Sequence, residues 1–178
     1  KFVNSGNGRM ITNGGKARSL GAEATIQARI TSNLTANINY GYTNATFRNY
    51  FHEEKQGSEI IRTDYKGNHI PYTPSHTLSA GLQYSKLLNN CWLDQFTASA
   101  QYSGAGKIWW TEKNDIGQDF YGTVNAKVGV RKGNIKLDVW TRNLLDADYT
   151  AFYFESFGNP YMQKGKPFQV GAEVSVAF

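Results

Sequence analysis

Hydrophobic and polar residues alternate with a period of two over seven long stretches of the chain. In the stretch 168–178, every second residue is apolar, and most of the residues between are polar or small. Because successive side chains of a β-strand point to opposite faces, this period predicts strands with one apolar and one polar face. The seven predicted strands are residues 19–30, 34–43, 78–85, 92–102, 120–131, 135–140 and 168–178. We therefore expect an all-β, antiparallel up-and-down meander of seven strands, or eight if residues 1–13 form another.

The connections between the predicted strands alternate between short and long. The short ones are residues 31–33, 87–91 and 132–134, and the long ones are about 44–76, 104–118 and 144–166. An antiparallel meander then has all tight turns at one end and all large loops at the other, as in transmembrane barrels. Strands of about 10 residues also suffice to cross a bilayer when tilted, and they exceed the usual 5–6 residues of soluble strands. Both features favour a membrane barrel over a Greek-key sandwich.

The polar face of the predicted strands carries charged residues that a dry core would not tolerate. They are Glu23, Arg29, Lys127, Arg131 and Glu173. A water-filled barrel interior suits such a face, and the apolar face then meets lipid. The aromatic residues of the apolar face lie mostly near strand ends, where amphipathic rings prefer the bilayer interface. They are Tyr40, Tyr42, Tyr84, Trp92, Phe96, Tyr102, Phe120, Phe168 and Phe178.

Composition and charge exclude several other classes of protein. The longest unbroken apolar run is residues 151–154, whereas a membrane-spanning helix needs about 20 apolar residues. The net charge of +5 comes from scattered Lys and Arg without a basic run, so we expect no nucleic-acid partner. The only cysteine, Cys91, cannot form an internal disulfide. The chain starts with Lys-Phe-Val and without a leader, so we expect a fragment of a longer protein.

No catalytic or metal-binding motif is present, and we expect no enzyme, no metal and no cofactor. The "HEEK" segment at 52–55 lacks the second histidine of a metalloprotease helix, and Ser75 beside His76 is not a catalytic triad. Metal ligation within the long polar stretch has the right residue types but no supporting spacing. Those residues are His52, His69 and His76 with Glu53, Glu54 or Asp64. We expect Asp146 and Asp148 to set a turn rather than to bind calcium.

Four segments, in order along the chain, resemble the C-terminal barrel region of TonB-dependent outer-membrane receptors of the siderophore and cobalamin type. They are "NGGKARSLGAEATI" (13–26), "NLTANINYGYTNATF" (33–47), "GNHIPYTPSHTLSAGLQY" (67–84) and "NLLDADY" (143–149). The final strand ending in an aromatic residue is also similar, whereas Leu145 stands where an aromatic is common. The resemblance implies a transmembrane barrel of about 22 strands with a plugged lumen. Residues 1–178 would be its C-terminal part, with the plug and the earlier strands upstream.

The same resemblance implies active uptake of a scarce solute across the outer membrane of a Gram-negative bacterium. The implied partners are outer-membrane lipid, the upstream plug and strands, TonB acting through the N-terminal region, and a small-molecule ligand. The barrel-assembly machinery would recognise the last strand, with Phe178 as its signal. An iron–siderophore or similar chelate is the expected ligand, while cobalamin, sugar and peptide stay open.

Aromatic residues in two long loops are the candidate ligand contacts. They are Trp109, Trp110, Phe152, Tyr153, Phe154, Phe157 and Tyr161. Apolar surface at the long-loop end suits solute capture, although the same rings can instead pack the loops together or lie at the lipid interface. Two alternatives to the receptor are a soluble carbohydrate-binding or adhesive β-sandwich and a complete small outer-membrane barrel.

Overall fold

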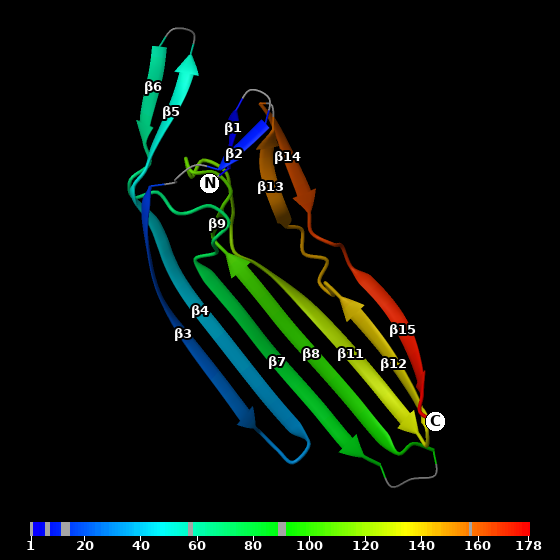
Figure 1. Cartoon of the computed structure of the whole chain (residues 1–178). Helices are drawn as coiled ribbons and strands as arrows, with labels where there is room; N and C mark the ends of the chain where they lie inside the picture. Colours follow the sequence, from blue (N-terminus) through cyan, green and yellow to red (C-terminus); the bar gives the residue numbers. More distant parts are fainter. Residues whose placement is uncertain (1, 6–7, 12–14, 57–58, 89–91, 157) are drawn as a thin grey trace.

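The chain folds into one large antiparallel sheet with four separate two-stranded hairpins. The computed structural model describes residues 2–5, 8–11, 15–56, 59–88, 92–156 and 158–178. The sheet consists of β3 (Lys16–Arg29), β4 (Leu34–Asn49), β7 (His76–Leu87), β8 (Gln95–Gly106), β11 (Tyr121–Lys132), β12 (Ile135–Arg142) and β15 (Gln169–Val176) (Figure 1). The hairpins are β1 (Phe2–Ser5) with β2 (Gly8–Ile11), β5 (Phe51–Gln56) with β6 (Glu59–Asp64), β9 (Ile108–Trp109) with β10 (Gly117–Gln118), and β13 (Thr150–Ser156) with β14 (Asn159–Lys164). In the described part of the chain, no helix is both long and apolar enough to cross a membrane.

The seven-stranded sheet confirms the predicted meander. Its strand order is β15-β12-β11-β8-β7-β4-β3, so every strand pairs antiparallel with its neighbours along this series. The short turns lie at one end of the sheet and the long excursions at the other (Figure 1). Phe2–Ser5 and Gly8–Ile11 form the β1–β2 hairpin, and neither of these two strands joins the sheet as an eighth member.

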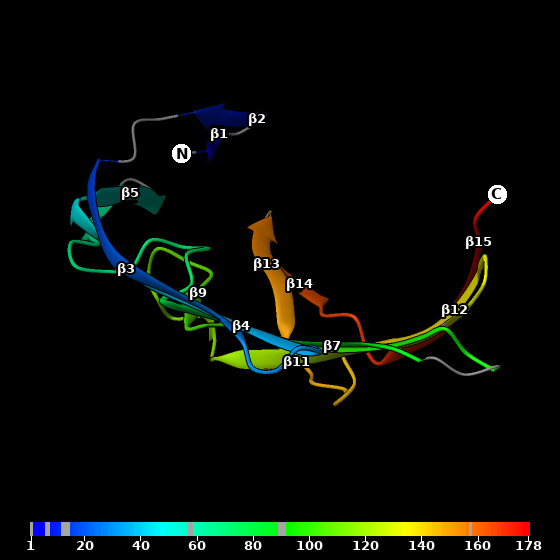
Figure 2. The same ribbon diagram turned by 90° about the horizontal axis from the view of Figure 1, so that it is seen from below.

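The sheet is a single curved layer, with the β13–β14 hairpin on its concave side (Figure 2). A cavity lined both by that hairpin and by Thr123, Asn125 and Gln169 of the sheet identifies the polar face as the concave one. The apolar face is convex, and its side chains remain open: Leu82 is 51% exposed and Val174 is 65% exposed. A β-sandwich would bury these side chains against a second sheet, and none of the described residues forms such a layer.

The short-turn end is held by Asp94, the charge that interrupts the alternation of residues 92–102. Its carboxylate accepts a hydrogen bond of 2.6 Å from the Gly133 backbone N–H. It also forms an ion pair with Lys132, whose Nζ lies 3.0 Å from Oδ1. The backbone N–H of Asp94 donates to the Arg131 carbonyl. These bonds, the Gly133 N–H first, lower the pKa of the Asp94 carboxyl below its usual value. Asp94 therefore joins two adjacent turns.

The stretch 44–76 is more ordered than the alternation predicts. Strand β4 continues to Asn49, the β5–β6 hairpin follows, and β7 begins at His76. The outer half of β4 is rich in Asn and Thr on both faces. A strand needs an apolar face only where it meets lipid, so the period-two signal disappears where the strand extends beyond the bilayer.

Candidate ligand-binding site

The buried hydrophobic side chains gather at the long-loop end of the molecule. Among the described residues they are Ala45, Tyr50, Tyr65, Ile108, Trp110 and Tyr153. Ile108, Trp110 and Tyr153 form one cluster, with Ala105, Ile116 and Tyr121 packed against it. We call Ile108, Trp110 and Tyr153 the loop core.

Hydrogen bonds from the main chain and from the Tyr72 hydroxyl bring three separate segments to the loop core. The Trp110 N–H donates to the Ile116 carbonyl at 2.9 Å, which closes the loop that follows β8. The Tyr72 N–H donates to the Trp109 carbonyl at 2.8 Å, and the Tyr72 hydroxyl donates to the Tyr153 carbonyl at 3.0 Å. Tyr72 therefore links the β6–β7 connection, the β8–β11 loop and the β13–β14 hairpin.

The Tyr153 phenol lies on the face of the β13–β14 hairpin that packs in the loop core. Its side chain is 4% exposed, and its hydroxyl donates to Glu155 Oε1 at 2.8 Å. Burial, followed by this bond to a carboxylate, raises the pKa of Tyr153 to about 12. Burial likewise raises the pKa of Tyr72, with Glu112 and Glu155 adding to the effect. Both phenols are therefore neutral hydrogen-bond donors at physiological pH.

The other face of the same hairpin carries an exposed row of rings. Phe152, Phe154 and Tyr161 alternate with Tyr153, because neighbouring side chains of a strand point to opposite faces. Phe154 stacks on its cross-strand partner Tyr161 with ring centres 5.1 Å apart, and Phe152 stacks on Tyr72 at 5.6 Å. The exposed fractions are 43% for Phe152, 37% for Phe154, 47% for Tyr161 and 49% for Tyr72. We call these four residues the aromatic ladder.

The structure thus divides the aromatic residues that the sequence offered as one group. Trp110 and Tyr153 pack in the loop core, while Phe152, Phe154 and Tyr161 belong to the exposed ladder. Trp109 is half-buried, and its ring lies 4.3 Å from Lys107 Nζ. Phe157 lies outside the described residues, as does Cys91. Tyr72 was not predicted, because a single ring between prolines in a long polar stretch produces no periodic signal.

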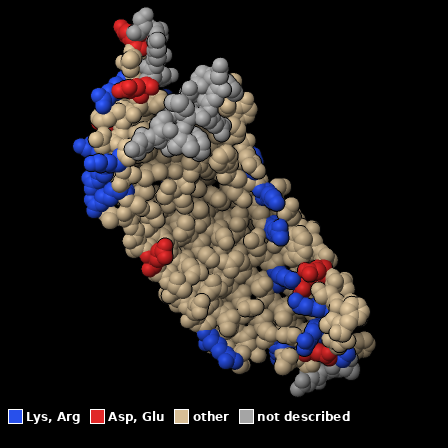
Figure 3. All heavy atoms as spheres, in the orientation of Figure 1, with Lys and Arg blue, Asp and Glu red and all other residues tan. Residues whose placement is uncertain are grey.

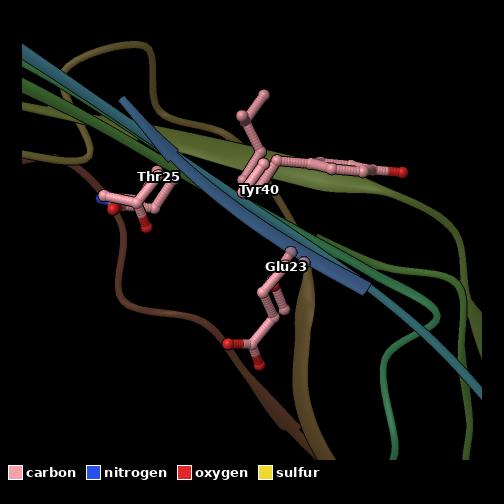
Figure 4. Close-up of a pocket in the computed structure, with 10 residues that line it drawn as sticks. Glu23, Thr25 and Tyr40 are labelled. Carbon is pink, nitrogen blue, oxygen red and sulfur yellow. The ribbon is translucent and has the colours of Figure 1, made fainter. Parts of the chain in front are cut away.

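Two cavities with mixed polar and apolar linings lie against the sheet. One, of about 330 Å³, is lined by Glu23, Thr25 and Tyr40 among others; Glu23 and Thr25 project on one side of the ribbons and Tyr40 on the other (Figure 4). The second, of about 350 Å³, lies between the concave face and the β13–β14 hairpin. It includes the cations Arg142 and Lys164. The polar residues that line the second cavity suit the interior of a barrel.

The concave face of the wall also holds a compact group of charges. Asp138 is 2% exposed, and its Oδ2 lies 2.9 Å from both Lys127 Nζ and Lys136 Nζ. Lys127 also reaches Glu173 at 3.7 Å. Two cations facing the buried carboxylate compensate much of its desolvation. The sequence predicted charges on this face but not their pairing.

The "NLLDADY" segment forms the turn that leads from β12 into the β13–β14 hairpin. The buried Asn143 donates from Nδ2 to the Ala147 carbonyl at 2.9 Å and to the Lys166 carbonyl at 3.0 Å. Asp146 Oδ1 accepts the Phe168 N–H at 2.8 Å, next to the start of β15. This bond ties Asp146 to the segment that precedes β15, while the Asp146 N–H donates to the Asn143 carbonyl at 2.9 Å within the turn itself. Asp148 instead forms an ion pair with Lys164 at 2.7 Å.

The three histidines lie in different environments. His52 stacks on Tyr65, the His69 N–H donates to Asn114, and His76 Nδ1 lies 2.8 Å from the Tyr40 hydroxyl. Over the described ranges, no group of three His, Cys, Asp or Glu residues is placed to hold a metal ion. Phe178 follows β15 and its side chain is fully exposed.

Comparison with known proteins agrees with this geometry. Residues 2–144 match the family model described as TonB dependent receptor-like, beta-barrel. The fold is similar to the ferric yersiniabactin uptake receptor FyuA from Yersinia pestis, with a TM-score of 0.77 and 18% identity over 93% of this chain and 24% of that one. It is also similar to the siderophore receptor PiuA from Acinetobacter baumannii, with a TM-score of 0.71 and 19% identity over 89% of this chain and 22% of that one.

The family match and the architecture support each other. The model covers well over half of the chain, and it includes six of the seven sheet strands, from β3 to β12. The chain spans about a quarter of the length of the two solved receptors. The polar concave face, the open apolar convex face and the separation of turns from loops are the features of a piece of barrel wall. The chain belongs to the family of TonB-dependent receptor-like β-barrels.

Proposed function

We propose that this chain supplies part of the wall and outer vestibule of a receptor that takes up an iron–siderophore or a similar chelate. TonB-dependent receptor barrels are outer-membrane proteins of Gram-negative bacteria, and the family consists of transport receptors rather than enzymes. The two similar solved structures are a ferric yersiniabactin uptake receptor and a siderophore receptor, which supports a chelate as ligand.

The exposed aromatic ladder is the observation that carries the ligand assignment. Four rings at 37–49% exposure present apolar surface at the long-loop end, which family barrels turn to the outside. Their positions are stabilised by stacking and by the Tyr72 hydrogen bonds, so the surface is formed before a ligand arrives. Planar or apolar parts of a chelate can stack on such rings. In this proposal, the loop core positions the ladder and makes no contact with ligand.

The sheet edges support the proposal that the wall continues beyond this chain. All 14 residues of β3 are exposed, and on its outer edge β3 pairs with no other described strand. β15 forms the opposite edge. Unpaired edges in lipid are costly, so we propose that further strands of the same protein close the barrel. The plug, the contact with TonB and recognition of the last strand and Phe178 by the assembly machinery belong to the same proposal.

The ladder is tested in the full-length receptor by titrating ligand and following tryptophan fluorescence. The double variant Phe154→Ala/Tyr161→Ala is expected to weaken binding of a ferric siderophore by about tenfold or more, as for the loss of a binding hot spot. Phe51→Ala is the matched control, because Phe51 is an exposed ring, 41% accessible, on the β5–β6 hairpin. Unchanged affinity in the double variant would remove the ladder from the binding site.

The class of solute is tested separately by growth. A strain that lacks the receptor gene is grown with defined ferric siderophores, cobalamin or glycans as the limiting nutrient. The proposal expects a growth defect on one or more iron chelates that the intact gene restores. A defect confined to cobalamin or to glycans would contradict the chelate assignment.

A further inference from the structure

The charged residues on the convex face of the sheet are all basic. All three acidic residues of the seven strands, Glu23, Asp138 and Glu173, occupy concave-face positions. The register gives the convex face uncharged rows through its middle, for example Ala28, Ala36, Leu82, Ala100 and Ala126. The charges that the alternation places on the convex face are basic and lie near strand ends. They are Lys16, Arg18, Lys86 and Lys132.

Two of these cations lie together at the long-loop end of β3. Lys16 and Arg18 are two residues apart, so both side chains point to the convex side. Lys16 pairs with Asn49 and Ala17 with Phe47, which leaves Arg48 as the extra residue of a bulge beside them. All three cations are exposed. Basic side chains gather along this edge of the molecule, over β3 and β4 (Figure 3). We call Lys16, Arg18 and Arg48 the basic rim.

An aromatic belt lies on the convex face between the apolar rows and the basic rim. Tyr40 and Tyr42 are 41% and 40% exposed, and both rings contact His76, with the Tyr40 hydroxyl 2.8 Å from His76 Nδ1. Tyr and His rings of this kind suit the boundary between acyl chains and headgroups. Tyr42 pairs with Ala22, and Arg18 lies four residues nearer the long-loop end of β3 than Ala22 does. At about 3.3 Å per residue along a tilted strand, Arg18 lies roughly 10 Å above the belt.

We propose that the basic rim binds the phosphate groups of lipid headgroups in the outer leaflet. Its height above the belt corresponds to the headgroup layer, and the Lys16 and Arg18 side chains face lipid rather than the barrel interior, with Arg48 in the bulge beside them. Arginine binds phosphate through paired N–H donors, and a lysine beside it adds a point charge. The uncharged rows below accommodate the acyl chains of the same lipid. The occupant is therefore a phosphorylated lipid rather than free phosphate or a solute on its way through the lumen.

The experiment uses the full-length receptor in phosphatidylcholine nanodiscs and a fluorescent bisphosphorylated lipid A. The triple variant Lys16→Gln/Arg18→Gln/Arg48→Gln is expected to weaken lipid A binding by about fivefold for each cation that contacts a phosphate. Lipid A binding is also measured for the single variant Arg18→Gln, which replaces the triple variant in the test if the triple variant folds poorly. Arg131→Gln is its charge-matched control, because Arg131 is an exposed arginine at a concave-face position of β11. This control is expected to bind lipid A like the unmodified receptor.

The chemistry of the lipid separates the possible outcomes. Dephosphorylated lipid A is expected to bind weakly to every form of the receptor, with no difference between Arg18→Gln and Arg131→Gln. Equal binding of bisphosphorylated lipid A by these two variants would overturn the proposal. So would complete displacement of the lipid by millimolar inorganic phosphate, because the rim would then be a site for free anions.

Discussion

The seven-stranded wall and the long-loop end keep their side chains in opposite environments. In the wall, continuous main-chain ladders join the strands, and apolar residues such as Leu82 and Val174 stay 51% and 65% exposed. At the long-loop end, Trp110 and Tyr153 are only 6% and 4% exposed, although Trp110 follows the two-residue strand β9 and Tyr153 lies in the seven-residue strand β13. The wall depends on the bilayer to cover its apolar face, whereas the long-loop end forms its own core in water. The stability of the wall therefore depends on contact with lipid, whereas the stability of the long-loop end depends on burial of apolar side chains away from water.

The largest expected loss of stability comes from a substitution in the loop core. Replacing Trp110 by alanine removes the largest ring of the cluster and should lower the local free energy of unfolding by about 3 kcal/mol or more. Hydrogen exchange is expected to accelerate in residues 108–118 and in the β13–β14 hairpin, while the β7 and β8 amides stay protected. Loss of protection throughout the wall would show that the two regions are not independent.

A charge on the convex face tests whether that face meets lipid. Leu82→Lys places an ammonium group near the middle of β7 and should lower the free energy of unfolding in liposomes by about 2–4 kcal/mol. Gln83→Lys is the matched control, because the adjacent residue points to the wet concave face. Denaturant titration in liposomes measures both. Equal costs for the two variants would contradict a lipid-facing convex side.

The Tyr153 phenol gives a smaller and pH-dependent effect. Tyr153→Phe removes the hydrogen bond to Glu155 and should lower stability at neutral pH by about 1 kcal/mol. Folding raises the pKa of this phenol from 10.0 to about 12, so its contribution is complete below pH 10 and is lost as pH rises towards 12. Denaturant titrations at pH 9, 11 and 12 should show a steeper alkaline loss in the unmodified receptor. Identical profiles for both proteins would contradict the raised pKa.

The smallest expected effect concerns Asp94 at the short-turn end. Because folding lowers its pKa, the contribution of Asp94 is present above pH 3.8 and is lost as pH falls through the lower folded value. Asp94→Asn should remove that acid dependence, as measured by denaturant titration between pH 6 and pH 2. Lys132→Gln is the control, since it removes the ion pair and leaves the Gly133 hydrogen bond. An unaltered acid profile in Asp94→Asn would exclude the turn clamp as its source.

Much of the wall was predictable because lipid and water impose a strict pattern on each strand. The predicted strand 120–131 corresponds to β11 at Tyr121–Lys132, and the predicted 34–43 corresponds to the inner part of β4. Where the strands leave the lipid, the pattern fails: β4 runs on to Asn49 and β7 begins at His76. There, the backbone hydrogen bonds to the neighbouring strand maintain the strand, and no lipid on one face requires an alternating sequence.

The candidate site was predictable only as a group of residues. The segment "AFYFES" is aromatic on both faces of β13, so its sequence does not indicate whether Tyr153 or Phe154 is buried. The β8–β11 loop decides this, because Trp110 and Ile108 cover the Tyr153 side and leave the Phe154 side open. Tyr72 joins the ladder from a connection some 80 residues earlier, through its bond to the Tyr153 carbonyl.

The sequence by itself determined seven wall strands, their two faces and the ends at which turns and loops lie, while the structure excluded an eighth strand from β1 and β2. These properties are local, because each strand must satisfy the same boundary between oil and water wherever its neighbours are. Only the tertiary structure decided which aromatic rings pack and which stay open, and how Asp138 meets its two lysines. Those outcomes depend on contacts between segments far apart in the chain, and no periodic pattern encodes such contacts.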